Sequence, residues 1–547
     1  VTLNTLATNA LTFATNGSIL NLVAGGLLLN SGSNTVGTAV GNGSITAGGA
    51  ASSGVQDLYF WTGTGNNNTN ILRSTIIDNG SGAQTRLVLT TRGNGNQPLT
   101  MYNGTNSYTG GTVLNTSANL QATSGVVIPN DTTGLTGLVL NNSALVMTVS
   151  AGQIGSGNAV TLNGGSLLTL FGNNTLAGLK YTNNYGMTAP TVNTGGMLTL
   201  TGGITTTSES DGNTGAAIAG LVSLPSSAAL SIGAATFNTL IINPLQADFV
   251  FNGVTGGGGA MTKSGTGVLQ FNAIGALSGA LDVTAGGLQS GGTNGGSRLA
   301  DVTLENGTWL NLNGNSSLFG SLAGTSTSLV TNSGVVNTLT VGSSNASSTF
   351  AGSFQRFSDS LVTAINLTKI GSGTMTLTGT TASTASGTLT INSSNGGGVT
   401  FSGSNGVNNF RAAAVTVNAD SALNLDNTTL VANRLGNAGV TLSGGTLNAS
   451  GGNADESGSA LTANSGLSTL LTGANTLSVK SFARGVGGAL NIGSSTVKVT
   501  TTAPSLTNSI LPGVFVGNDF ATVSATNTPV TAYAAYTTGD LGTTGVS

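Results

Sequence analysis

Cysteine and histidine are both absent from the 547 residues. Without cysteine the chain can form no disulfide framework. Without either residue, Ser-His-Asp catalysis, Cys-His catalysis and the usual zinc sites are excluded. The chemistry that remains available is that of carboxylates, hydroxyls, amides and a few basic groups.

Charge is also scarce, at 5% of the residues with a formal net charge of −3. Binding to nucleic acid requires a basic stripe, which 13 Lys and Arg spread over this length do not supply. Disordered chains combine low hydrophobicity with high net charge, whereas 38% of this chain is hydrophobic. The longest apolar stretches, such as residues 22–29, are too short to cross a bilayer. We therefore predict a folded chain with no nucleic-acid partner and no membrane span.

Thr, Val, Ser, Asn and Gly dominate what is present, with 87 Gly. Apolar and polar residues alternate over 374–378 (Thr-Met-Thr-Leu-Thr) and 388–392 (Thr-Leu-Thr-Ile-Asn). This period of two indicates half-buried strands, and the Gly, Asn and Ser clusters between them indicate turns. The predicted core includes Leu269, Phe271, Met375, Leu377, Leu389 and Ile391.

The outward positions of these strands carry Thr, Ser and Asn rather than Lys or Glu. Hydroxyls and amides can stack on their own kind in rungs about 4.8 Å apart, where like charges would repel. The segment at 160–167 also recurs in degenerate form at 302–309 and at 440–447. Internal repeats of short strands predict an all-β solenoid, a stack of similar coils.

Residues 99–113 (Leu-Thr-Met-Tyr-Asn-Gly-Thr-Asn-Ser-Tyr-Thr-Gly-Gly-Thr-Val) resemble the autotransporter-associated β-strand repeat of bacterial surface proteins. Residues 262–271 and 368–377 resemble its Thr-Lys half, and 341–352 resemble the strand that often precedes it. The resemblance implies a right-handed parallel β-helix in the form of an elongated rod. It also implies a place outside the cell or on the bacterial surface, with roles in adhesion, aggregation or as a stalk.

We predict a continuous solenoid with degenerate repeats over 1–505 and a strand-rich junction segment over 506–547 that leads to a next unit. The C-terminal stretch resembles a segment found between tandem units in giant proteins of this repeat family. The chain opens at Val1 on a strand-like stretch with no signal segment, so we expect a processed product or a fragment. A cut solenoid exposes a rung of unpaired backbone groups. We therefore expect one unit of a fibre whose partner is another copy, joined head to tail.

Two acidic clusters could carry chemistry. Glu209 and Asp211 would share a strand face, as a glycosidase or Ca²⁺ site needs, whereas Asp455 and Glu456 would point in opposite directions. Both clusters lie in Gly, Ser and Asn stretches, and we interpret them as solvated turns. We therefore predict no catalytic residue, no cofactor site and no metal site, and we do not expect an enzyme.

Tyr59, Phe60 and Trp61 could form a platform for stacking sugars, but we favour a strand edge or a plug at the end of a coil. Asn-x-Ser/Thr triplets at Asn16 and Asn42 would be exposed and could accept glycans. The function we predict is an extracellular structural or adhesive solenoid. The alternatives are a polysaccharide-acting β-helix enzyme and a glycan-bearing or glycan-binding fibre.

Overall fold

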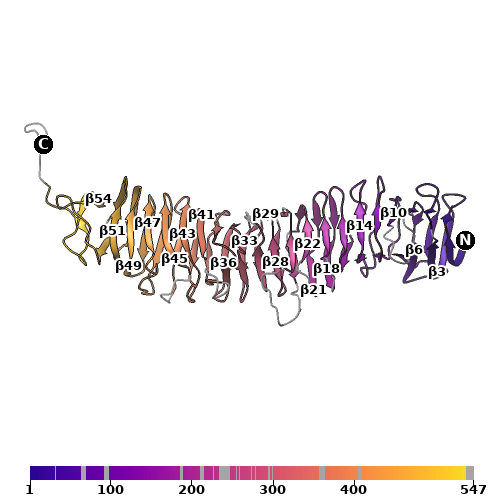
Figure 1. The fold of residues 1–547 in the computed structure, drawn as a ribbon, viewed down its shortest axis with the longest axis horizontal. Coiled ribbons are helices and arrows are strands. Elements are labelled where there is room, and N and C mark those ends of the chain that lie inside the picture. Colours follow the sequence, from indigo (N-terminus) through magenta and orange to yellow (C-terminus); the bar gives the residue numbers. More distant parts are fainter. Residues whose placement is uncertain are drawn as a thin grey trace, which may run out of the picture. The chain divides into compact units, whose positions relative to one another are not determined.

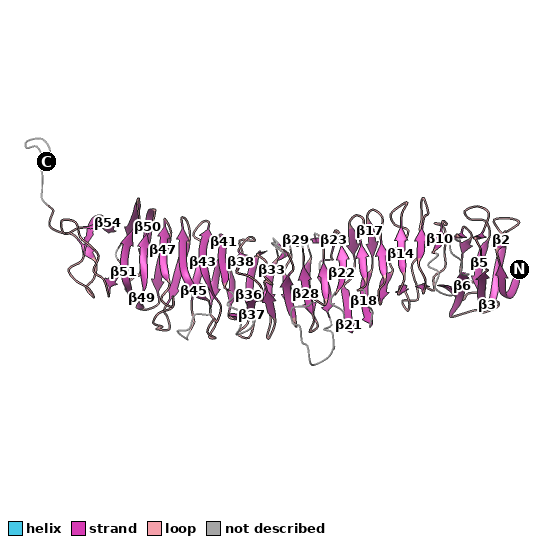
Figure 2. Ribbon diagram, viewed as in Figure 1, coloured by secondary structure: helices cyan, strands magenta, loops and turns pink. Residues whose placement is uncertain are grey.

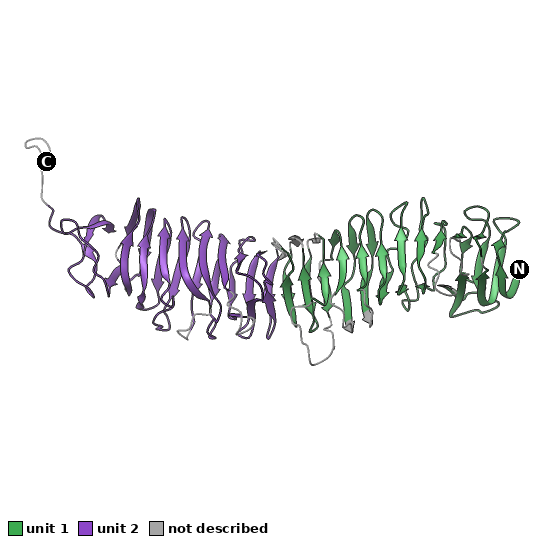
Figure 3. Cartoon of the chain, viewed as in Figure 1, with its two compact units in different colours: residues 1–297 green, residues 298–547 purple. Residues whose placement is uncertain are grey.

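A computed structural model describes residues 1–30, 32–62, 69–91, 98–184, 189–209, 215–225, 227–232, 247–253, 255–257, 259–272, 274–277, 279–292, 296–297, 300–356, 364–403, 410–493 and 495–536. Regular structure in these ranges is all strand, with no helix among them (Figure 2). The chain divides into two compact units, Val1–Ser297 and Arg298–Ser547 (Figure 3).

Unit 1 is a stack of coils whose strands form three ladders, and each strand pairs in parallel with its counterpart in the next coil (Figure 1). The first ladder contains β1 Thr2–Thr8, β3 Ile19–Leu29, β5 Ser44–Ala47, β6 Val55–Thr62, β8 Thr75–Ile76, β9 Gln84–Thr91, β11 Thr112–Leu114, β13 Leu138–Asn141, β15 Ala159–Asn163, β18 Gly178–Asn184, β21 Ile204–Glu209, β24 Ser227–Ile232, β27 Ala260–Ser264 and β30 Leu281–Val283. The second contains β2 Ala10–Leu11, β4 Asn34–Val36, β7 Asn70–Leu72, β10 Leu99–Met101, β12 Ala118–Leu120, β14 Ala144–Met147, β16 Leu167–Thr169, β19 Thr191–Asn193, β22 Ala216–Ala219, β25 Phe249–Phe251, β28 Val268–Phe271 and β31 Gly287–Ser290. The third contains β17 Asn174–Leu176, β20 Leu198–Leu200, β23 Val222–Ser223, β26 Thr255–Gly257, β29 Ile274–Leu277 and β32 Gly296–Ser297.

Unit 2 repeats this plan of parallel ladders. One ladder contains β33 Asp301–Leu304, β36 Ser321–Gly324, β39 Ser348–Phe350, β42 Thr374–Leu377, β44 Gly398–Phe401, β46 Ala422–Asp426, β48 Thr446–Ser450, β50 Gly466–Leu471, β52 Gly488–Asn491 and β54 Leu511–Val516. Another contains β35 Ser317–Phe319, β38 Asn337–Val341, β41 Ile365–Gly371, β43 Ser386–Ser393, β45 Arg411–Asn418, β47 Gly439–Ser443, β49 Ala454–Ala463, β51 Thr476–Arg484 and β53 Thr496–Val499. A short one contains β34 Trp309–Asn311, β37 Leu329–Asn332 and β40 Ser353–Arg356.

The predicted all-β fold of parallel stacked coils is confirmed. All six predicted core residues are buried, among them Phe271 at 2% exposure and Leu389 at 0%. In β43 the inward residues Leu389 and Ile391 alternate with outward Thr388 and Thr390, as a period of two requires. Each fully buried Val, Leu, Ile or Phe contributes roughly 1.5–3 kcal/mol relative to the exposed side chain, so this inner face supplies the main driving force for folding.

The pairing changes near the end of unit 2. β54 pairs in parallel with β52, but β55 Asp519–Thr522 runs antiparallel to β54, and β56 Thr531–Ala532 runs antiparallel to β55. This antiparallel segment lies within the stretch 506–547 that the sequence set apart as a junction.

A bend in β3 shapes the first coils of unit 1. Residues 19–22 of β3 pair with β5, while residues 26–29 pair with β6. Gly25 lies between them with φ 73°, and a Cβ there would collide with the carbonyl oxygen of Asp57. Glycine at this position therefore lets a single strand bridge two neighbours, and it brings Gly26 beside Tyr59.

Candidate functional site

The candidate site lies on the outer face of unit 1, where β6 presents two aromatic side chains. Leu58 and Phe60 are fully buried, and Tyr59 and Trp61, which alternate with them, are 41% and 46% exposed. The pair borders a surface groove of about 440 Å³, lined by Gly26, Tyr59, Trp61, Val88, Thr90 and Asn115. The groove is open enough to admit a small organic group.

β6 is not the end of a stack. It pairs with β3 on one side, Gly26 beside Tyr59, and with β9 on the other, Val88 beside Tyr59. The favoured interpretation of the aromatic cluster as a strand edge or coil-end plug is therefore wrong. Because residues 58–61 are all apolar or aromatic, the sequence alone does not separate the buried Leu58 and Phe60 from the outward Tyr59 and Trp61.

Parallel register extends each aromatic residue into a row that crosses successive coils. The apolar row begins at Tyr59 and continues through one valine each of β9, β11 and β13. These are Val88, which is only 7% exposed, and the half-buried Val113 and Val139. The amide row begins at Trp61, beside Thr90. Asn115 follows Leu114, which pairs with Leu89, so Asn115 lies next to Thr90. The amide row then continues through Asn141 and Asn163.

The asparagines of the amide row form a hydrogen-bonded ladder. Asn163 Nδ2 donates to Asn141 Oδ1 at 2.7 Å, and Asn141 Nδ2 donates to Asn115 Oδ1 at 2.7 Å. An amide NH₂ carries two N–H groups and its oxygen two lone pairs, so each rung of the ladder keeps spare capacity. Asn115, at the groove, is exposed, and its Nδ2 donates to none of the described residues. The ladder therefore ends in an available donor beside the aromatic pair.

An ion pair borders the same groove. Arg86 Nε lies 2.6 Å from Asp57 Oδ1, and the Tyr59 hydroxyl donates to Asp57 Oδ2 at 2.9 Å. Burial would raise the pKa of Asp57, but the hydrogen bonds from Arg86 and Tyr59 outweigh it, and the pKa is lowered. The carboxylate is therefore ionised at neutral pH, and it holds the Tyr59 ring in place.

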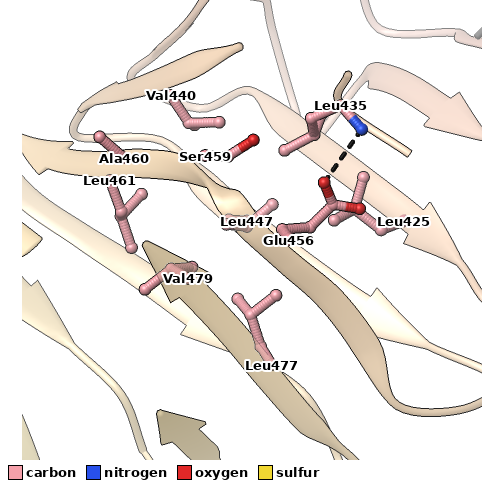
Figure 4. A pocket seen from close by; sticks show the side chains of 10 residues that line it. All are labelled: Leu425, Leu435, Val440, Leu447, Glu456, Ser459, Ala460, Leu461, Leu477 and Val479. Carbon is pink, nitrogen blue, oxygen red and sulfur yellow. Dashed lines mark hydrogen bonds between the residues drawn. The ribbon is translucent and has the colours of Figure 1, made fainter. Parts of the chain in front are cut away.

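A second polar cluster is buried in unit 2, around Glu456 of β49 (Figure 4). Glu456 is 1% exposed, and its carboxylate accepts hydrogen bonds from the backbone N–H of Arg434 at 2.7 Å and of Leu435 at 3.0 Å. Burial raises the pKa of Glu456 to about 7, although these hydrogen bonds and the nearby Arg434 charge oppose the change. The adjoining cavity, lined by leucines, has about 10 Å³ of free space, which is too small for a sugar.

This geometry corrects the interpretation of Asp455 and Glu456 as a solvated turn. They do point in opposite directions, Asp455 outward and Glu456 inward, but both lie in a strand. The Gly-Ser stretch is extended here, with an irregularity in register between Glu456 and Ala460. The backbone N–H groups of residues 434–435 donate to the Glu456 carboxylate, and these hydrogen bonds allow the side chain to be buried. The sequence around Glu456 gives no indication of these two donors.

The other predicted acidic pair, Glu209 and Asp211, lies at the edge of the described residues, so its arrangement is not described. Glu209 is the last residue of β21, and Asp211 lies outside the described residues. Within the described ranges, no group of three or more Asp and Glu side chains could hold a metal ion.

Two lysines of the repeat motif are buried, which the sequence did not reveal. Lys263 is 0% exposed, and its Nζ donates to the carbonyls of Gly265, Gly267 and Ala285 at 2.5–2.7 Å. Lys369, at the matching motif position, is 1% exposed and donates to Ile370 O at 2.6 Å. Burial lowers the pKa of each to about 8. The recurrence of Thr-Lys before a Gly-x-Gly turn was the available signal.

The two predicted glycan-acceptor triplets differ in access. Asn16 is exposed, as expected. Asn42 is 7% exposed, and its Oδ1 accepts from the backbone N–H of Phe13 and of Thr38. The prediction that Asn42 is exposed is therefore wrong, because its amide holds together the turn that contains it.

Comparison of the chain with protein-family models, with curated proteins and with solved structures finds no match in any of the three. The resemblance to the autotransporter-associated repeat stays a prediction from the sequence. Across the part of the chain that the structure describes, no helix has the length and apolarity needed to cross a membrane.

Proposed function

We propose that this chain is a structural and adhesive solenoid of the bacterial surface, working outside the cell. The observation that carries the proposal is the outward face of the coils, where uncharged amides and hydroxyls stack from rung to rung. In unit 1 these are Asn115, Asn141 and Asn163. In unit 2, Asn448 donates to Asn424, and Asn424 donates to Thr400.

Such a surface suits a scaffold more than a reaction centre. Stacked neutral groups stabilise a long repeat without charge repulsion, and they present many weak contact points to a neighbouring surface. The repeat-like segments at 99–113 and 368–377 support the same role through their resemblance to bacterial surface proteins.

Self-association is part of the proposal. β1 pairs in parallel with β3, yet all its residues are exposed or half-exposed, including Leu3 at 38%. An accessible strand of low charge favours pairing with another chain. Contacts of this kind between copies would build a filament.

Labelling of intact cells that make the protein tests the proposed location and role. An antibody raised against the 547-residue chain should label unpermeabilised cells, and external protease should remove the signal. Cells from which the gene is deleted should attach less well to surfaces. Labelling that appears only after permeabilisation would contradict the proposal.

A further inference from the structure

We propose that the apolar row and the amide row of unit 1 together bind a neutral, extended, β-linked glycan that lies along the direction in which the coils stack. The inference rests on the proposed adhesive function and names the ligand. The binding surface starts at Tyr59 and Trp61 and continues along the two rows to Val139 and Asn163.

The spacing of the rows fits a sugar chain. Neighbouring rungs of a parallel ladder lie about 4.8 Å apart, close to the length that one residue adds to an extended β-linked hexose chain. Same-face neighbours on one strand, such as Tyr59 and Trp61, lie about 6.6 Å apart, which is close to the width of a hexose ring. One sugar per rung can therefore repeat its contacts from coil to coil.

The chemistry of the two rows matches the two kinds of surface on a sugar. A β-linked glucose residue presents axial C–H groups on its ring faces and equatorial hydroxyls on its rim. The exposed rings of Tyr59 and Trp61 suit the C–H faces, and so do the half-exposed Val113 and Val139. Gly26, which pairs with Tyr59 from the neighbouring strand, has no side chain and therefore leaves that side of the Tyr59 ring uncovered.

The amide row supplies the hydrogen bonds. The ladder bonds orient the amides of Asn115, Asn141 and Asn163 before any ligand arrives, so little side-chain entropy is lost on binding. Their second N–H groups and lone pairs can donate to and accept from hydroxyls, which do both. Asn115 contributes a whole NH₂ group that donates to none of the described residues.

The charges around the rows favour a neutral ligand. No charged residue belongs to either row between Tyr59 and Asn163. At the edge of the groove, Asp57 and Arg86 neutralise each other. An acidic polysaccharide, a nucleic acid or a charged peptide would find no counter-charge along this surface.

The binding of cellohexaose to the whole chain, measured by isothermal titration calorimetry, tests the inference. Trp61→Ala should weaken binding at least tenfold, because it removes the stacking surface. Asn141→Ala and Asn163→Ala should each weaken it roughly threefold to tenfold, the range expected for a lost hydrogen bond. Maltohexaose, which is α-linked and curved, should bind at least tenfold more weakly than cellohexaose.

Phe171→Ala is the matched control, since Phe171 is 45% exposed in the same unit but lies outside both rows. It should leave binding unchanged, and circular dichroism should show that each variant keeps the β fold. The inference is overturned if cellohexaose does not bind, or if Trp61→Ala binds as tightly as the unaltered chain. It is also overturned if Trp61→Ala weakens binding but the two asparagine variants do not, because the glycan would then lie along β6. None of these outcomes affects the antibody labelling of intact cells, so the two proposals fail separately.

Discussion

A single buried acid, Glu456, gives the chain a dependence of stability on pH. Its folded-state pKa of about 7 lies above the ordinary value of 4.5, so the folded chain holds the proton more tightly than the unfolded chain does. The contribution of Glu456 to the free energy of unfolding is therefore greatest below pH 4.5, falls as the pH rises toward 7, and is level above that. The difference attributable to this group is on the order of 3 kcal/mol.

Glu456→Gln should remove this part of the pH dependence, because the amide resembles the protonated acid. Urea unfolding at several pH values between 4 and 8 would measure it. Asp455→Asn is the control, since Asp455 is the exposed neighbour on the same strand. If the unaltered chain and the Glu456→Gln variant lose the same amount of stability over this pH range, the pH dependence does not come from Glu456.

At the scale of elements, the turn between β27 and β28 depends on Lys263. Its ammonium group satisfies two carbonyls of that turn, Gly265 and Gly267, and a third, Ala285, in the next coil. Lys263→Met keeps the apolar stem but leaves these acceptors without their donor, and should cost roughly 2–5 kcal/mol of stability. Lys180→Met, which alters an exposed lysine of β18, should cost less than about 0.5 kcal/mol in the same thermal or urea unfolding experiment. Equal losses in the two variants would refute the role of Lys263.

The inner face of the strands could be predicted from the sequence because it depends on a local pattern. Alternation marked Met375, Leu377, Leu389 and Ile391 as core, and all four are buried. A parallel solenoid converts that pattern directly into structure, since each coil needs only an apolar face and a turn. The buried lysines and Glu456 could not be predicted in this way, because carbonyls and N–H groups of other turns and coils make their burial possible.

The candidate site was visible only in part. The sequence showed an aromatic cluster at 59–61, but the two rows depend on which residues of successive coils lie side by side. Asn115, Asn141 and Asn163 are separated by 26 and 22 residues, an unequal spacing set by turn lengths. No fixed period in the sequence links them, so the row appears only once the register of the strands is known.

At the scale of the whole molecule, low charge stabilises the stack of coils within one chain, but it also lowers the repulsion that keeps separate chains apart. With a net charge of −3 over 547 residues, stacked coils experience little repulsion, but separate chains also repel one another weakly. We propose that copies of the chain meet through exposed apolar residues on accessible strands. β1 is such a strand, with Val1 83% and Leu3 38% exposed.

Leu3→Lys should therefore reduce self-association of the chain, because a charge on an accessible strand opposes pairing with a second copy. Sedimentation velocity over a range of concentrations should show the unaltered chain forming larger species, with the onset for Leu3→Lys raised at least several-fold. Val486→Lys introduces the same charge at a fully exposed position of unit 2, outside any strand, and should leave association unchanged. An unaltered chain that remains monomeric at every concentration would show that β1 does not join copies. Equal suppression by both lysine variants would show instead that net charge governs association, whatever its position.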